Sequence, residues 1–177
     1  MQFRKVVIDD KQVLINGKTV YEDALIAEDV YRQMQMNYPK FFKMDVLCKW
    51  AMIGAEYLLK EEESYIYEKI DKTKIAVVLA TKSGCLDVDK KYWESAQTLA
   101  SPALFVYTLP NIMLGEICIK HGFKGEQLCI VQENFNREEL FFWVNDLLKN
   151  RGMEACICGF VEASEYGVNV ELEWVIN

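Results

Sequence analysis

Proline and glycine are scarce in this sequence, at three and nine residues among 177. The chain is nevertheless 51% hydrophobic and 12% aromatic. Few chain breakers in so apolar a sequence exclude a disordered protein and predict a compact, ordered one. A chain of this length supplies one domain with a substantial core and is short for two, so we predict a single domain over residues 1–177.

Positive charge is also in short supply. Lysine and arginine number 20 against 27 aspartates and glutamates, which gives a net charge of −7. Phosphate binding needs a positive field, so this balance argues against nucleic acid as a partner. The sequence also has no aromatic pair inside a basic strand and no zinc-finger spacing, the usual signs of a nucleic-acid-binding module.

Long apolar runs are absent as well. The N-terminus, MQFRKVVIDD, lacks the apolar segment of a secretion signal, and the longest apolar candidate, Val46 to Leu59, is interrupted by Lys49 and Glu56. No stretch reaches the length needed to cross a bilayer. We therefore expect a soluble, cytoplasmic protein with no membrane span.

The six cysteines do not follow the spacing of zinc ligands. They lie inside apolar segments such as ACICGF, where Cys156 and Cys158 share one face of a strand without a second pair. Asp87 and Asp89 have no third ligand nearby in the sequence, which favours a solvated loop there. We predict reduced core thiols, no metal site and no cofactor.

The sequence does contain alternating strand and helix patterns. Residues 43–60 carry apolar side chains at a period of 3.6, with Gly54 on a narrow stripe that allows close packing. The apolar run 74–80 predicts a strand covered on both faces, and Asn16-Gly17 predicts a type I′ hairpin. These patterns predict an α/β protein, a layered mixed sheet with helices on it.

The remaining elements follow from the same patterns. Further strands are predicted at residues 3–8, 12–15, 18–21, 127–132, 154–161 and 168–176. Residues 61–64 are expected to close the helix at 43–60, and a solvated helical extension follows them to Ile70. Further helices are predicted within 23–36, at 92–99, at 111–121 and from Asn136 onward, and an extended segment at 102–110. The helix at 111–121 is expected to bury Ile112, Leu114 with Gly115, and Cys118 with Ile119.

One strand-to-helix corner stands out as a candidate site. The apolar run Leu128 to Val131 turns through 132–136 into a helix, for which Asn136 is a plausible N-cap with Glu139 in the capping-box position. Many enzymes expose a nucleophile at such a corner. Here the turn contains no serine, cysteine or threonine.

Four segments in this order resemble the β-ketoacyl synthase family. They are PKFFKMD at 39–45, the segment from Ser101-Pro102 through Asn111 to Gly115, Gly125 opening an apolar strand, and ACICGF after Gly152. The resemblance covers roughly residues 39–163 and is greatest for short proteins that match the N-terminal half of a synthase. It implies a thiolase-like half-fold and a place in fatty-acid, polyketide or aryl-polyene-type biosynthesis of type II.

The departures from the family pattern concern its chemistry. Active members carry a cysteine at the corner, and counting along this chain places Asn134 or Phe135 there. The nearest thiol, Cys129, stands mid-strand, and the family's downstream catalytic residues belong to a second half that the sequence, ending at Asn177, does not include. We interpret the single histidine, His121, as a partner of a helix C-terminus.

Three functions stay open at this point. The resemblance implies an auxiliary or chain-length-factor-like subunit, which forms a homo- or heterodimer and pairs with a catalytic ketosynthase or an acyl carrier protein. Its candidate interface is the segment carrying Phe105, Tyr107, Leu109 and Asn111, which in the family lies at the dimer contact. The second function is an active acyltransferase or thioesterase-like enzyme that uses Glu133 or Cys129. The third is a stand-alone domain that binds a small ligand near 132–136.

Overall fold

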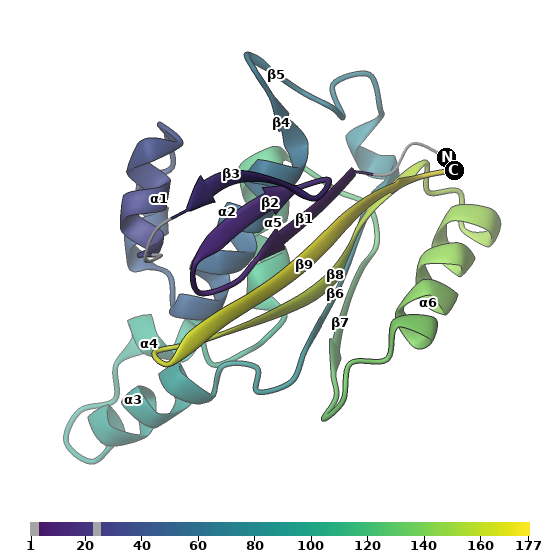
Figure 1. Ribbon diagram of the computed structural model, residues 1–177. Helices are drawn as coiled ribbons and strands as arrows, with labels where there is room; N and C mark the ends of the chain where they lie inside the picture. The colour runs from purple at the N-terminus through teal and green to yellow at the C-terminus, as the bar shows by residue number, and fades with distance from the viewer. Residues whose placement is uncertain (1–3, 23–25) are drawn as a thin grey trace.

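A seven-stranded mixed sheet forms the centre of the computed structural model, which describes residues 4–22 and 26–177 (Figure 1). The order across the sheet is β3-β2-β1-β9-β8-β6-β7. Strands β6, β7 and β8 run parallel, and β9 lies antiparallel between β8 and β1. The strands are β1 (Arg4–Ile8), β2 (Gln12–Ile15), β3 (Lys18–Glu22), β6 (Ile75–Thr81), β7 (Gln127–Val131), β8 (Ala155–Ser164) and β9 (Gly167–Ile176).

Helices cover both faces of this sheet (Figure 1). Helices α2 (Val46–Leu59) and α5 (Ile112–His121) pack on one face, and α6 (Arg137–Asn150) packs on the other. Strand β6, between the two layers, is buried at every position. The predicted α/β layering, with its mixed sheet, is confirmed.

Helix α2 is the main support of the larger core. Asp45 caps its N-terminus by accepting a hydrogen bond of 3.1 Å from the Cys48 backbone N–H. At Gly54 a Cβ atom would lie 2.9 Å from side-chain carbons of both Val170 and Leu172 on β9. The narrow stripe expected at Gly54 is therefore what brings the helix backbone close to the sheet.

Local signals located several elements correctly. Asn16 and Gly17 both have positive φ in the turn between β2 and β3, as a type I′ hairpin requires. Gly152 has a φ of 74° just past the end of α6. The last strand buries Val168, Val170, Leu172 and Trp174. Phe3 of the predicted first strand and residues 23–25 of the predicted 23–36 region lie outside the described residues; α1 (Ala27–Gln33) follows them.

Three expectations were wrong. Residues 102–110 are not extended, because Ser101 accepts a hydrogen bond from the Leu104 backbone N–H and Pro102 opens a short helix, α4 (Pro102–Val106). Residues 60–65 form a small hairpin, β4 (Lys60–Glu61) and β5 (Ser64–Tyr65), and turns follow it, so the helical extension to Ile70 does not form. The buried stripe of α5 was only partly predicted: Leu114 and Cys118 are buried as expected, but Ile119 is exposed, and Met113 and Ile117 are buried as well.

The predicted short helix at 92–99 begins earlier than expected. Helix α3 (Leu86–Ala96) already includes Asp87 and Asp89, which were expected in a loop. Asp87 accepts a hydrogen bond of 2.9 Å from the Glu165 backbone N–H, so it ties α3 to the turn between β8 and β9. Within the described ranges, no helix is long and apolar enough to cross a membrane.

His121 belongs to a buried polar network. Its Nδ1 lies 2.9 Å from the Tyr67 hydroxyl, and its Nε2 lies 3.1 Å from Glu56 Oε1, although not at a good hydrogen-bonding angle. Lys120 also binds Glu56, and Tyr65 donates to it. Burial lowers the pKa of His121, against the opposing effect of Glu56. The imidazole is thus a core residue, which its position at a helix end did not reveal.

We expect Gly54→Leu to destabilise the protein, because the new side chain meets Val170 and Leu172 in a close-packed core. Overpacking of this kind costs about 1–3 kcal/mol of unfolding free energy. Gly115 of α5 is the matched control, since nothing lies within 4 Å of its Cβ position. Gly115→Ala should stabilise the helix by about 0.5–1 kcal/mol. Urea unfolding monitored by circular dichroism measures both, and equal midpoints for the two variants would contradict the assignment.

We expect the unfolding free energy to fall as the pH drops below 6.5, the ordinary pKa of histidine. The pKa of His121 is lower in the folded chain than in the unfolded chain. His121 therefore makes its full contribution to the unfolding free energy above pH 6.5, and this contribution decreases as the pH falls toward the folded pKa. Glu56 titrates in a more acidic range, because its His121 and Lys120 partners lower its pKa despite burial. Thermal unfolding over this pH range, with His121→Asn as control, tests the effect. A wild-type slope that persists in the variant would refute it.

Candidate functional site: the strand-to-helix corner at the open edge of the sheet

The predicted corner exists, and its residues lie at the end of the sheet's edge strand. Strand β7 ends at Val131, and α6 begins after the cap at Asn136. Glu133 and Asn134 are exposed to solvent. Phe135 is half-buried, with its ring centroid 5.1 Å from that of Phe160 on β8. None of these residues has the positive φ that a strained turn would show.

Two backbone amides at the start of α6, those of Asn136 and Glu139, bond to side chains of the same chain. The Asn136 side chain accepts a hydrogen bond of 3.1 Å from the Glu139 backbone N–H, which confirms the predicted cap. With its amide turned to suit both neighbours, Gln132 accepts from the Asn136 backbone N–H at 2.8 Å and donates to Glu139 at 3.2 Å. Gln132 therefore takes the place that the capping box would give to the Glu139 carboxylate.

Cys129 is poorly placed to act at this corner. Its side chain packs on the α5 side of the sheet, whereas Leu128 and Ile130 pack on the α6 side. Burial raises the pKa of its thiol to about 11. A thiol with so high a pKa supplies little thiolate near neutral pH. Glu133 has neither a nucleophile nor a base beside it among the corner residues.

A second carboxylate, Glu162, holds the neighbouring loop. It accepts hydrogen bonds from the backbone N–H of Lys82 at 2.9 Å and of Ser83 at 3.1 Å, and from the Thr81 hydroxyl at 3.0 Å. These donors lower its pKa although burial alone would raise it. The Lys82-Ser83-Gly84 loop, which only superficially echoes a phosphate-binding loop, thus binds an anion from its own chain.

Strand β7 leaves one edge of the sheet open. Val77 donates its N–H to the Glu126 carbonyl and Gln132 donates its N–H to the Thr81 carbonyl, so the even-numbered backbone groups of β7 face β6. By the two-residue period of a strand, the odd-numbered groups, Gln127, Cys129 and Val131, face outward. In the part of the chain that the structure describes, no strand pairs with them. The Val131 side chain is 58% exposed.

Apolar helix surfaces flank this open edge. A groove between β7 and α5 is lined by Gly115, Ile119 and Phe123, and one between β7 and α6 by Leu128, Trp143 and Leu147. Ile119 and, on α6, Phe142 are each 64% exposed.

The sequence-predicted interface is only partly exposed. Phe105 and Leu109 are exposed, and so is Asn111 at the start of α5. Tyr107 is buried, and its hydroxyl donates to Glu116 at 3.3 Å. Leu86, Trp93, Leu99 and Val106 are exposed on the same α3–α4 region, which extends from the body of the molecule in Figure 1.

Comparisons with known proteins give a consistent picture of the fold. No family model and no curated protein matches the sequence. Among solved structures, the ishigamide ketosynthase/chain length factor superposes with a TM-score of 0.70 at 16% identity, over 82% of this chain and 47% of that chain. The present chain therefore spans about half the length of this neighbour.

Two further neighbours are complexes. The ketosynthase ApeO with its chain length factor ApeC, from Xenorhabdus doucetiae, matches with a TM-score of 0.63 at 12% identity, over all of this chain and 78% of that chain. AntDE:AntF, a type II acyl-carrier protein with its ketosynthase bound to the hexaketide, matches with a TM-score of 0.64 at 12% identity. The match covers 100% of this chain and 63% of that chain. The fold is thus the thiolase-like one of ketosynthases and chain length factors, as the sequence resemblance implied.

We expect Cys129 to form no acyl-enzyme. Because burial raises its pKa to about 11, its alkylation by iodoacetamide should be slow near neutral pH and should accelerate toward that value. Incubation with an acyl-thioester should leave the mass of the chain unchanged. Peptide mass spectrometry measures both reactions, with the urea-unfolded chain as the positive control. An acyl adduct on Cys129, or on any residue of the corner, would refute this prediction.

Proposed function

We propose that this protein is an auxiliary, chain-length-factor-like subunit that pairs through β7 with a catalytic ketosynthase in an acyl-chain condensation of type II. The supporting observation is the open edge of β7, which lies directly beside a corner that offers no nucleophile. A partner that adds a strand there would place its own active site next to this corner. The condensation chemistry would then belong to the partner, and this chain would complete the surface around it.

The physical case begins with the edge itself. Native proteins usually protect an edge strand with charged residues, proline or a bulge. Strand β7, QLCIV, has none of these, and three of its five side chains are half-buried. Uncovered backbone groups on an apolar strand are a template for pairing with another chain.

Gly115 on α5 also supports a partner that binds beside β7. A glycine inside a helix costs about 1 kcal/mol relative to alanine, and no atom of this chain approaches its Cβ position within 4 Å. The described fold therefore gives no packing reason for it. A partner backbone approaching the groove between α5 and β7 would supply one.

Because the corner offers no nucleophile, we propose that the partner is the catalytic subunit. Two of the structural neighbours are described as a ketosynthase with its chain length factor and as a ketosynthase with an acyl-carrier protein. In our proposal this chain takes the non-catalytic place in such a pair, as a heterodimer. Phe105, Leu109 and Asn111 provide a second contact surface on the α3–α4 region, and Tyr107 supports it from beneath through Glu116.

We expect Val131→Lys to abolish the pairing while the chain stays folded, because a charged side chain on an edge strand opposes strand addition. Val20→Lys on β3, the other edge strand, is the matched control, since Val20 is also an exposed valine at 46%. The measurement is light scattering after co-expression with a type II ketosynthase. Wild type and Val20→Lys should each give a 1:1 complex, and Val131→Lys should leave two separate species.

Three results would overturn the proposal. They are the absence of a complex with wild type, a complex that survives Val131→Lys but not Val20→Lys, and a stable homodimer that excludes the ketosynthase.

A further inference from the structure

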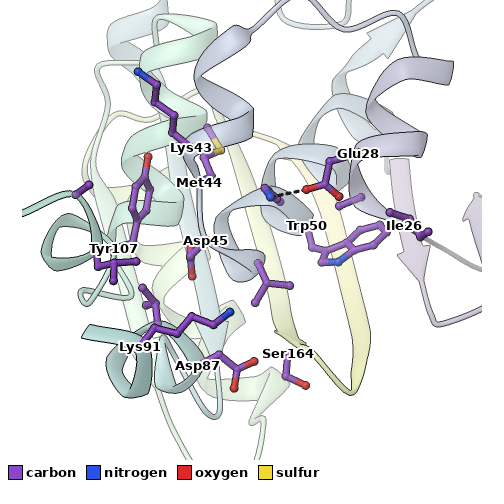
Figure 2. Close-up of a pocket in the computed structure, with 16 residues that line it drawn as sticks. Ile26, Glu28, Lys43, Met44, Asp45, Trp50, Asp87, Lys91, Tyr107 and Ser164 are labelled. Carbon is purple, nitrogen blue, oxygen red and sulfur yellow. Dashed lines mark hydrogen bonds and ion pairs between the residues drawn. The ribbon is translucent and has the colours of Figure 1, made fainter. Parts of the chain in front are cut away.

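A cavity of about 450 Å³ lies away from the β7–α6 corner, between α1, α2, α3 and α4 (Figure 2). Its volume is in the range of small-molecule sites. Apolar side chains from three of these elements or their flanking residues form its walls, among them Trp50, Val88, Leu104 and Tyr107. Ser164, the last residue of β8, also lines it, so the cavity lies at the carboxyl ends of the parallel strands. Open α/β sheets commonly bind ligands at that edge.

Asp45 is one of the charged residues that line this cavity. Figure 2 shows its carboxylate directed into the space between Tyr107 and Lys91. Its hydrogen bond to the Cys48 backbone N–H involves one carboxylate oxygen. Burial raises the pKa of the Asp45 carboxyl, against the opposing effect of the hydrogen bonds at the start of α2.

Three lysines line the cavity, and none of them forms an ion pair with Asp45; Lys43, which has no ion pair among the described residues, extends away from Asp45 in Figure 2. Lys49 pairs with Glu28 at 2.5 Å, and Lys91 pairs with Glu165 at 2.7 Å. Within residues 4–22 and 26–177, no ammonium or guanidinium group forms an ion pair with Asp45. A half-buried carboxylate that faces a largely apolar cavity and has no ion-pair partner of its own is the arrangement that a cationic ligand completes.

We propose that this cavity binds a small molecule with an apolar, ring-sized body and a protonated amine, the ring against Trp50 and Met44 and the amine on Asp45. The apolar walls account for the body, and the unpaired carboxylate selects the charge. An anionic ligand of the same shape would meet repulsion from Asp45 and Asp87, which also lines the cavity. This site is separate from the β7 edge, so it does not depend on the proposed function.

The test compares two probes of matching shape, 2-phenylethylamine and 3-phenylpropionate, titrated into the full chain. Nuclear magnetic resonance follows the Met44 methyl group and the Trp50 indole N–H. We expect saturable shifts at both positions, with the amine bound about fivefold more tightly than the carboxylate, the strength of a partly exposed ion pair.

Three variants make the test specific. Asp45→Asn keeps a good N-cap side chain and should bring the two probes to about equal affinity. Asp89→Asn removes an exposed carboxylate from α3 that does not line the cavity, so it should keep the preference. Ala103→Trp, at an exposed lining position, should fill the space and abolish both titrations. If Asp45→Asn fails to fold, two results still test the proposal: the preference of the wild-type chain for the amine over the carboxylate, and the loss of binding in Ala103→Trp.

The proposal is overturned if the amine produces no saturable shift at Met44 and Trp50, or if wild type binds both probes equally. It is also overturned if the amine preference survives Asp45→Asn or if binding survives Ala103→Trp.

Discussion

The parallel pairing of β6 with both β7 and β8 is the constraint on which the rest of this structure depends. It brings three strand ends to one edge of the sheet, at Thr81, Val131 and Ser164. The Glu162 carboxylate on β8 thereby reaches the loop after β6, and the corner after β7 lies beside that loop. The same pairing leaves β7 outermost. The position of the corner and the openness of the edge are therefore two consequences of one topology.

The corner joins a strand to a helix, and residues 132–136 include no serine, cysteine or threonine. The Asn136 and Gln132 side chains occupy two amides at the start of α6, those of Glu139 and Asn136, and Glu162 occupies those of Lys82 and Ser83 in the neighbouring loop. The nearest thiol faces the opposite side of the sheet. The backbone amides of Lys82, Ser83, Asn136 and Glu139 therefore bond within the chain and are not free to bind a substrate oxygen. Around β7 the side chains of Val131, Ile119 and Phe142 are exposed to solvent.

Much of the fold was predictable because its signals are local. The helical stripe of α2, the continuous apolar run of β6 and the Asn16-Gly17 turn each depend on residues close in sequence. Residues 102–110 were misassigned because the alternation of Phe105, Tyr107 and Leu109 resembles a strand, whereas Ser101 and Pro102 form a helix start. The role of Glu162 could not be predicted from the sequence, since its partners lie about 80 residues away and meet it only through the pairing of β8 with β6. The open edge of β7 likewise depends on strand order, which local patterns do not determine.

The outward amides of β7 test the central claim most directly. Hydrogen–deuterium exchange of Gln127, Cys129 and Val131 can be measured for the isolated chain and for its mixture with a type II ketosynthase. Our account predicts fast exchange alone and strong protection in the mixture, because a partner strand would take up these N–H groups. Unchanged exchange at all three amides, or protection confined to β3, would contradict it.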